Sequence, residues 1–545
     1  MHILCHLLCL YRKHSDNFFE LSIVRVLNGD RKFSFRFIMV ALLKTSAISG
    51  IEGQNVEVEV YTKLGQNKFT IIGLGDSAVK ESRDRVTQAI RHLGYYVPNV
   101  VLVNLAPAEI RKEGASYDLA MALGILISSG QIKVDNLDDI FFYGELSLEG
   151  KIKPLRGVLS LAISAMENGA KRVVVPRENY MEASLVKGIE IIPMASLLEL
   201  INYLSNGSRQ TDFSSLIKRQ EKVRRQTSIA EVYGQEQAKR ALLIAAGGGH
   251  NVLMIGPPGC GKSMLANRFS SLLPALSQEE CMEVVKLHSV AGYPIESYLQ
   301  GERPYRNPHH VVSDIGLIGG GNIPRPGEIS LAHHGVLFLD EFPEFRRSAL
   351  ESLRAPMESR KVQITRAKAS YVFPANFQLI AAMNPCPCGR LGVVSADCLC
   401  SRSSIHAYFK KLSEPILDRI DMHVELDALP FSEFKQNQDY KQKDSTADLQ
   451  AAVVMARERQ YKLRNRLNAY VEAKEINKSA LIREEALSLL EKASKQISLS
   501  ARSLVRVLRV ALTIADLEGS DKITSAHVAE ALSFRRLDRL KQHAA

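Results

Sequence analysis

The segment that most constrains the fold is residues 256–263, which read GPPGCGKS and fit the pattern G-x-x-x-x-G-K-[ST]. The apolar run 251–255 before it is typical of a buried strand, and residues 264–269 after it are typical of the first turns of a helix. A strand, a glycine-rich loop and a helix in this order cradle phosphate, because loop N–H groups and the helix N-terminus face one anion. The segment therefore predicts a nucleotide site.

Each residue type in this loop has an expected role. Lys262 is expected to reach the β- and γ-phosphates, and the Ser263 hydroxyl is expected to bind Mg²⁺. The remaining loop residues are expected to surround the phosphates of ATP: Gly256, Pro257, Pro258, Gly259, Cys260 and Gly261.

Polar side chains follow the next two apolar stretches. Asp340 and Glu341 come after the run 335–339, and Asn384 follows the run 377–383. In a doubly wound sheet, ligands bind at the carboxyl ends of the strands. We therefore expect Asp340 to hold Mg²⁺, Glu341 to act as general base on the attacking water, and Asn384 to contact the γ-phosphate or that water. Without the phosphate loop, an acidic helix cap and a turn asparagine would explain the same residues.

The overall composition limits the classes of partner that the chain can bind but does not identify one. The chain has 545 residues with 70 basic and 59 acidic side chains, a net charge of +11. This excess permits a polyanion such as DNA but does not require it. No run is as apolar as a membrane span, and the short apolar stretch 4–10 lacks the flanks of a signal peptide. We expect a cytoplasmic protein without a membrane partner.

The pattern of strands, helices and polar segments predicts an α/β protein with several parts. Residues 39–205 alternate strands (56–61, 69–74, 100–105) with helices (77–93, 118–128), and the part from 228 predicts a doubly wound parallel sheet. The expected division is a loosely ordered extension 1–38, an α/β domain 39–205, a linker 206–227, a nucleotide-binding core 228–430 and a helical part 431–545. Thr524 is expected to cap a final helix that runs to Leu532.

Four of the eight cysteines lie close together: Cys386, Cys388, Cys398 and Cys400. Four thiolates suit tetrahedral Zn²⁺, and this clustering differs from a secreted disulfide framework. The C-x-C spacing is tighter than the usual C-x₂-C, so unpaired thiols or a redox pair are the alternatives. If metallated, the segment 386–400 is expected to be a structural zinc knuckle without a catalytic role.

Several motifs together resemble one branch of the AAA+ ATPases. They are YGQEQAKRA (233–241), the phosphate loop, PRPGEISLA (324–332), LFLDEF (337–342) and AMNPCPCG (382–389). The region 228–535 resembles the magnesium-chelatase ATPase subunit and its bacterial relatives, the YifB/ComM group. The resemblance implies a homo-hexamer with a helical lid.

The same resemblance implies roles for three polar residues. Asn384 becomes sensor 1, Arg419 becomes an arginine finger directed at the ATP of a neighbouring subunit, and Arg502 becomes sensor 2. An ion pair with Asp418 or Asp421 is the alternative for Arg419, and simple exposure in a helix is the alternative for Arg502. Arg506 and Arg509 follow at helical spacing, and we expect them on a solvated or interface face.

In the segment 361–373, apolar and polar residues alternate before Arg366 and after Lys368. This pattern predicts two strands of a hairpin with basic residues near its tip. Lys368 matches a pore-hairpin lysine of the similar MCM helicases, so the resemblance implies sequence-independent phosphate contacts by Lys368 and Arg366. An ordinary surface hairpin is the alternative. The histidine pairs 309–310 and 333–334 could be metal ligands, but no nearby carboxylate has the sequence spacing of a known metal site.

Residues 39–205 are similar to the proteolytic domain of Lon. Ser116 falls at the position of the Lon nucleophile, but Leu159 falls at the position of its catalytic lysine. A serine nucleophile needs an activating base, so we expect no peptidase activity unless Lys151 or Lys153 substitutes.

The sequence thus predicts an ATP-dependent motor. The resemblance implies a hexameric helicase that drives branch migration on single-stranded or branched DNA in natural transformation or recombination, with recombination proteins as partners. A magnesium-chelatase-like chaperone that remodels a protein partner is the alternative. A Lon-like protease is disfavoured by Leu159.

Overall fold

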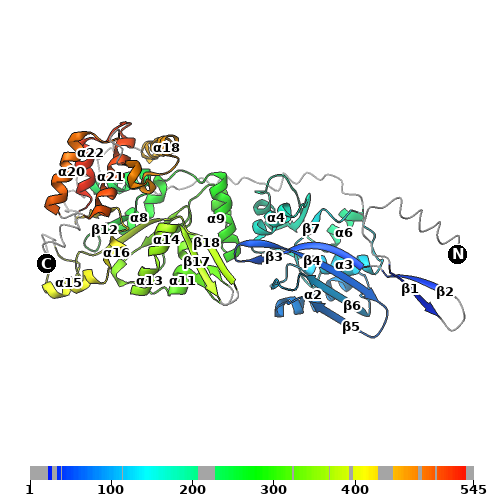
Figure 1. The fold of residues 1–545 in the computed structure, drawn as a ribbon. Helices are drawn as coiled ribbons and strands as arrows, with labels where there is room; N and C mark the ends of the chain where they lie inside the picture. Colours follow the sequence, from blue (N-terminus) through cyan, green and yellow to red (C-terminus); the bar gives the residue numbers. More distant parts are fainter. Residues whose placement is uncertain are drawn as a thin grey trace. The chain divides into compact units, whose positions relative to one another are not determined.

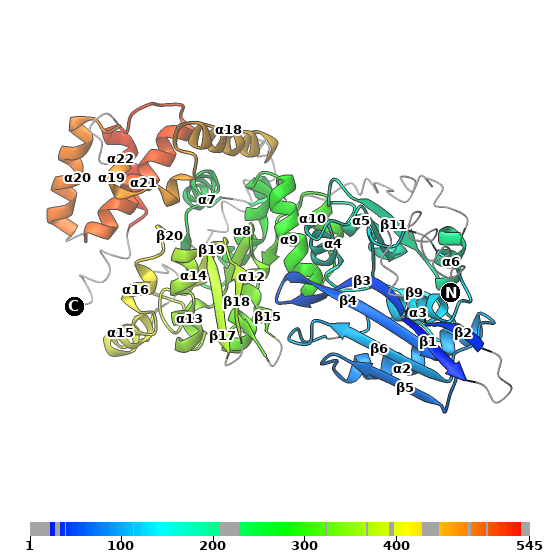
Figure 2. The same ribbon diagram turned by 45° about the vertical axis from the view of Figure 1, so that its right-hand side comes forward.

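The computed structural model describes residues 22–27, 33–38, 40–112, 114–134, 136–205, 228–232, 234–321, 324–366, 369–391, 397–427, 446–476, 481–497 and 500–535. The chain forms two compact units (Figures 1 and 2). The first comprises residues 1–221 with 288–295, and the second comprises residues 222–287 with 296–545. The predicted linker 206–227 lies outside the described residues.

The first unit is built on a seven-stranded mixed sheet in the order β11-β10-β7-β3-β4-β6-β5. Alternation of side chains along β4 buries Val56, Val58 and Val60 completely, which is why this segment forms a half-buried strand. The strands are β3 (Val40–Ser49), β4 (Glu52–Lys63), β5 (Lys68–Ile72), β6 (Val100–Ala106), β7 (Ile140–Phe142), β10 (Arg172–Pro176) and β11 (Glu190–Met194). The main helices are α2 (Ser77–His92), α3 (Asp118–Ser128), α4 (Val158–Glu167) and α6 (Leu197–Ser205), with the short α5 (Tyr180–Ala183).

The strands and helices predicted for residues 56–128 are therefore confirmed within a few residues. Two small hairpins accompany the sheet: β1 (Ser22–Leu27) with β2 (Phe33–Ile38), and β8 (Glu145–Leu146) with β9 (Ile152–Lys153). The first hairpin lies in the predicted extension 1–38, whose other residues are outside the described ranges.

The two positions that resemble the Lon catalytic pair differ in burial. Ser116 is half-buried in the turn before α3, and Leu159 is completely buried in the first turn of α4. Lys151 pairs with Glu149 through an Nζ–Oε2 distance of 2.8 Å, and its side chain is largely exposed. Leucine has no proton-accepting group, so the geometry gives Ser116 no base at the position where Lon has one.

The second unit contains a five-stranded parallel sheet in the order β13-β16-β19-β12-β20. This sheet confirms the predicted doubly wound core. Every residue of β12, β16 and β19 is buried, as expected for central strands covered on both faces. The strands are β12 (Val252–Ile255), β13 (Tyr305–Arg306), β16 (Val336–Leu339), β19 (Gln378–Met383) and β20 (Met422–Glu425).

Helices and two hairpins surround this sheet. The helices are α7 (Glu236–Gly248), α8 (Lys262–Phe269), α9 (Gln278–Ala291), α10 (Glu296–Leu299), α11 (Asp314–Ile318), α12 (Glu328–Leu331), α13 (Arg347–Ser352), α14 (Arg354–Ser359), α15 (Arg402–Lys410) and α16 (Glu414–Leu417). The hairpins are β14 (Gly319–Gly320) with β15 (Arg325–Pro326), and β17 (Lys361–Arg366) with β18 (Ala369–Pro374). Figure 2 shows β15 beside β17 and β18.

The C-terminal helices pack together and against α7, and they are orange to red in Figure 1. They are α18 (Thr446–Arg464), α19 (Ala473–Ile476), α20 (Glu484–Ile497), α21 (Ala501–Leu517) and α22 (Ser525–Ser533). Thr524 caps α22 as predicted, because its side chain accepts from the N–H of His527. Across the described ranges, no helix has both the length and the hydropathy to cross a bilayer.

The structure does not place Arg506 and Arg509 on a solvated face, one of the two settings expected for them. The side chain of Arg506 is only 11% exposed and lies 3.7 Å from Asp421, measured from Nε to Oδ1. Arg509 donates from Nε to the carbonyl of Val471 at 2.8 Å. This face of α21 lies against Asp421, just before β20, and against the chain before α19, so the two arginines contact groups of their own chain.

Candidate nucleotide-binding site

The predicted phosphate loop has the expected local structure. The loop connects the carboxyl end of β12 to α8, which begins at Lys262. Gly259 and Gly261 have φ angles of 78° and 97°, a region that side chains with a Cβ rarely adopt. The two glycines let the backbone curl at the N-terminus of α8, where N–H groups are left without helical partners and can bind an anion.

The ammonium of Lys262 is held at the floor of this loop. Its Nζ donates to the carbonyls of Gly256 (2.6 Å) and Pro257 (2.9 Å) and to Oδ1 of Asn384 (3.1 Å). Only 8% of the residue is exposed. An ammonium has three donors, so these three oxygens satisfy it, and phosphate oxygens could replace them.

The two predicted Mg²⁺ ligands meet directly. Ser263 Oγ donates to Oδ2 of Asp340 at 2.6 Å, which joins α8 to the end of β16. The other oxygen of Asp340 accepts from the backbone N–H of Glu341 at 2.9 Å. A hydroxyl and a carboxylate oxygen are the hard donors that Mg²⁺ prefers, so these residues fit that ion.

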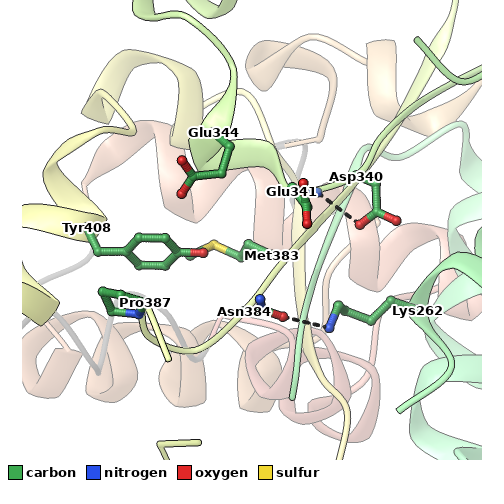
Figure 3. Close-up of a pocket in the computed structure, with 8 residues that line it drawn as sticks. All are labelled: Lys262, Asp340, Glu341, Glu344, Met383, Asn384, Pro387 and Tyr408. Atoms are coloured by element: carbon green, nitrogen blue, oxygen red, sulfur yellow. Dashed lines mark hydrogen bonds between the residues drawn. The ribbon is translucent and has the colours of Figure 1, made fainter. Parts of the chain in front are cut away.

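Figure 3 shows that Lys262, Asp340, Glu341 and Asn384 line one pocket, although they come from the ends of two strands, β16 and β19, and from helix α8. The sequence predicted all four. The other lining residues were not predicted: Glu344, Met383, Pro387 and Tyr408. Burial raises the pKa of Tyr408 to about 12, so its hydroxyl stays protonated and can act as a hydrogen-bond donor at neutral pH.

The two remaining predicted arginines lie in different settings. Arg419 forms an ion pair with Glu358 of α14 at 2.5 Å and donates to the carbonyl of Pro415. Its partner within the chain is therefore Glu358 and not Asp418 or Asp421. Arg502 is exposed in the first turn of α21. The role of each arginine at a nucleotide stays a prediction.

The four clustered cysteines fit a tetrahedral metal. Their Sγ atoms all lie within 4.8 Å of one another. The distance between Cys386 and Cys388 is 3.4 Å, and Cys398 lies 3.7 Å from both. Four sulfurs around one Zn²⁺, each bonded at about 2.3 Å, would be about 3.8 Å apart. The described part of the knuckle therefore matches the dimensions of a Cys₄ zinc site.

The electrostatics of the four thiols also favour a cation. A hydrogen bond from the backbone of Arg390 lowers the pKa of Cys388 below its ordinary value. Burial and the hydrogen bond with Cys388 raise the pKa of Cys398, and the hydrogen bond with Cys388 and burial raise the pKa of Cys400. A divalent cation would let all four deprotonate.

This knuckle lies next to the nucleotide pocket. Pro387, between two of the cysteines, lines the pocket. A Cβ at Gly389 would be 2.8 Å from the ring of Pro258 in the phosphate loop. The knuckle therefore lies against the phosphate loop, a placement that its sequence alone does not indicate.

The histidine pair 333–334 has a carboxylate partner that sequence spacing did not show. Glu283 of α9 accepts from Nε2 of both His333 and His334 at 2.7 Å. However, Nδ1 of His333 accepts from the backbone N–H of Asn376 at 2.9 Å, so Nε2 must carry the proton. A metal at Nε2 would require loss of that proton, which favours a hydrogen-bonded cluster over a metal site.

The predicted hairpin is present as β17 and β18, with Thr365 opposite Ser370 and Arg366 opposite Ala369. Arg366 is exposed and donates to the carbonyl of Gly321 at 3.3 Å. Lys368 lies outside the described residues. The structure thus places a basic residue at the end of the hairpin, and DNA contact there stays a prediction.

Sequence reasoning missed His310, which contacts a predicted catalytic residue. Its Nδ1 lies 2.9 Å from Oε2 of Glu341. The only signal in the sequence was the histidine pair 309–310, which follows β13 by a few residues.

Comparisons with known proteins cover most of the chain. The family described as "Magnesium chelatase, subunit ChlI" matches residues 228–434, and two related families match residues 56–179 ("Subunit ChlI of Mg-chelatase") and 443–535 (its C-terminal part). Competence protein ComM of Haemophilus influenzae is 38% identical over 508 residues, covering 92% of this chain and 99% of ComM. YifB of Escherichia coli is 40% identical over 507 residues, covering 92% and 98%. Lon protease 2 of Bacillus subtilis is 30% identical over 167 residues, covering 28% of this chain and 30% of that protease.

Proposed function

The chain belongs to the YifB/ComM family of magnesium-chelatase-like AAA+ proteins, and from this premise we propose that it hydrolyses ATP as a hexameric ring and moves along DNA. The observation that carries the ATPase part is the convergence of Lys262, Asp340, Glu341 and Asn384 on one pocket. An ammonium, two carboxylates and a glycine-rich loop around one pocket are the groups that phosphoryl transfer uses.

The side chains divide the chemistry among them. Lys262 can exchange its carbonyl partners for phosphate oxygens and so neutralise charge that develops at the γ-phosphate. Ser263 and Asp340 would hold Mg²⁺, which would supply positive charge to the phosphates. Glu341 would accept a proton from the attacking water, and Asn384 would orient that water or the γ-phosphate.

Assembly into a ring would explain Arg419. In the single chain its guanidinium is paired with Glu358, whose side chain is 62% exposed. Such an exposed carboxylate is a weak partner, so a neighbouring subunit's γ-phosphate could compete for the arginine. A finger supplied from a neighbour is worth about 10³–10⁵ in rate in GTPases, which would make hydrolysis depend on assembly.

The DNA part of the proposal has three supports. The chain carries a net charge of +11, Arg366 is exposed on the β17–β18 hairpin, and ComM of Haemophilus influenzae is named for competence. We infer a helicase that drives branch migration on single-stranded or branched DNA in natural transformation or recombination, together with recombination proteins. The names of the matching families support one alternative, a chelatase-like chaperone that remodels a protein partner.

Two variants test the ATP site. Lys262→Ala should abolish binding of a fluorescent ATP analogue, because it removes the cation that faces the phosphates. Glu341→Gln should bind the analogue normally but hydrolyse ATP about 10²–10⁴-fold more slowly, the usual contribution of a general base. Tight binding by the first variant would refute the loop assignment, and normal turnover by the second would remove Glu341 as base.

A further inference from the structure

One tyrosine of the C-terminal helices contacts both ends of the β17–β18 hairpin at its base. The base is closed by the N–H of Ala375, which donates to the carbonyl of Arg360 at 2.8 Å. Tyr470 belongs to the short helix η7 (Asn468–Tyr470). The guanidinium of Arg360, just before β17, lies over the Tyr470 ring with its Cζ 3.4 Å from the ring centroid. The Tyr470 hydroxyl donates to Oδ1 of Asn376, just after β18, at 3.3 Å.

Both contacts suit the groups that make them. A guanidinium over the face of an aromatic ring is attracted by the negative charge of that face. Within the described ranges no carboxylate forms an ion pair with Arg360, so the Tyr470 ring is the partner of its charge. Burial raises the pKa of Tyr470, so its hydroxyl keeps the proton that it donates to Asn376.

Tyr470 is fixed to helix α21 on both sides. Before it, the completely buried Asn468 donates from Nδ2 to Oδ2 of Asp516 at 2.7 Å. After it, the carbonyl of Val471 accepts from Nε of Arg509 at 2.8 Å. Asp516 and Arg509 both belong to α21, so a shift of this helix would carry Tyr470 with it. The first turn of α21 also holds Arg502, the predicted sensor 2.

The base of the hairpin lies between the nucleotide pocket and the basic tip. Asn376 is followed closely by β19, whose carboxyl end leads to Asn384 in the pocket. The other end of the hairpin carries the exposed Arg366. The two strands form a separate sheet of their own, so contacts at the base help to set the direction of the tip.

We propose that Tyr470 is a positioning residue that couples the C-terminal helices to the hairpin proposed to contact DNA. Its contacts with Arg360 and Asn376 transmit a shift of α21 to the strands that carry Arg366. The proposal deepens the motor function above and rests on it. Tyr470 does not line the nucleotide pocket, so its loss should spare ATP binding and reduce the response to DNA. Because coupling between binding sites is reciprocal, its loss should also weaken the effect of a bound ATP analogue on DNA affinity.

The test compares the ATPase rate of full-length variants with and without single-stranded DNA. Tyr470→Ala should keep its ATP-analogue affinity and basal turnover within about twofold of wild type and lose most of the several-fold gain from DNA. Tyr470→Phe keeps the ring over Arg360 and should retain about half of the gain or more. Tyr461→Ala, which removes a 52% exposed tyrosine of α18, is the matched control and should respond fully. Arg360→Ala should resemble Tyr470→Ala, and the double variant should lose no more than either alone, as expected for residues that act as a pair.

Hydrogen exchange without DNA reports the contact itself. Peptides from β17 and β18 should exchange faster in Tyr470→Ala than in wild type or Tyr461→Ala. A full DNA response in Tyr470→Ala, an equal loss in Tyr461→Ala, or unchanged exchange in the hairpin would overturn the coupling. Loss of basal turnover together with the DNA response would also overturn it, because Tyr470 would then only support the fold. A wild-type protein that DNA does not stimulate would instead refute the motor function on which the proposal rests.

Discussion

Replacing Asp421 should loosen the attachment of the C-terminal helices to the ATPase sheet. Asp421 is 6% exposed, and its Oδ2 accepts from the N–H of Asn251, just before β12, at 3.0 Å. The same carboxylate lies 3.7 Å from His250 and 3.7 Å from Arg506 of α21. Removing one partner of a buried ion pair costs about 3–5 kcal/mol, because the other charge stays buried alone. The long contacts favour the lower limit, about 3 kcal/mol.

Hydrogen exchange measured by mass spectrometry can report the loss of stability in individual segments. A local measurement is needed because a chain of two units need not unfold in one step. In Asp421→Ala, peptides from α21 should exchange about 10²-fold faster, the equivalent of about 3 kcal/mol. Asp521→Ala is the matched control: Asp521 is 91% exposed and pairs with Arg459, so its loss should cost less than about 1 kcal/mol. Unchanged exchange in α21 of Asp421→Ala, or equal effects of both variants, would refute the reasoning.

The stability difference between wild type and Asp421→Ala should depend on pH in a defined direction. Burial acts to raise the pKa of Asp421, but the hydrogen bond and charge of His250 and the charge of Arg506 outweigh it, so the pKa lies below its ordinary 3.8. A lowered carboxylate pKa stabilises the fold above the unfolded value and ceases to do so as pH falls through the folded value. The advantage of wild type over Asp421→Ala should therefore be full above about pH 4 and disappear in stronger acid.

Two other predictions concern assembly and the cysteines. Mixing Arg419→Ala with Lys262→Ala subunits should restore part of the ATPase activity that each variant lacks alone. A mixed interface can combine an intact phosphate loop from one subunit with an intact arginine from the other. Absence of any rescue would argue against an arginine finger that acts between subunits. Cys398→Ser should lose about one equivalent of zinc by native mass spectrometry and weaken ATP binding several-fold, because the knuckle packs on Pro258. Cys281→Ser, which removes a buried thiol outside the quartet, should keep its zinc; a zinc content that Cys398→Ser leaves unchanged would exclude the proposed ligand set.

The parts of the site that could be predicted share one property. Lys262 and Ser263 are adjacent in a loop of fixed geometry, and Asp340 and Asn384 directly follow apolar runs. Parallel strands bring their carboxyl ends to one edge, so local patterns were enough to place these residues together. The cysteines were equally readable because four of them fall within fifteen residues of each other (386–400).

The parts that could not be predicted depend on packing between distant segments. His310 reaches Glu341 across 31 residues of chain, and Glu283 reaches His333 across 50. Arg506 has the helical spacing of a surface residue, but α21 turns that face toward the buried Asp421. No local sequence pattern predicts such pairs, because each contact depends on how a whole helix or strand packs against a distant one.

The most direct test of the proposed motor is the ATPase rate of the purified protein with no DNA and with single-stranded, duplex or branched DNA, alongside its native mass. We predict a hexameric mass with ATP and a turnover that single-stranded or branched DNA raises several-fold, a gain that Arg366→Ala combined with Lys368→Ala should reduce. A protein that remains a monomer with ATP and DNA present, and whose turnover no DNA increases, would contradict the proposal.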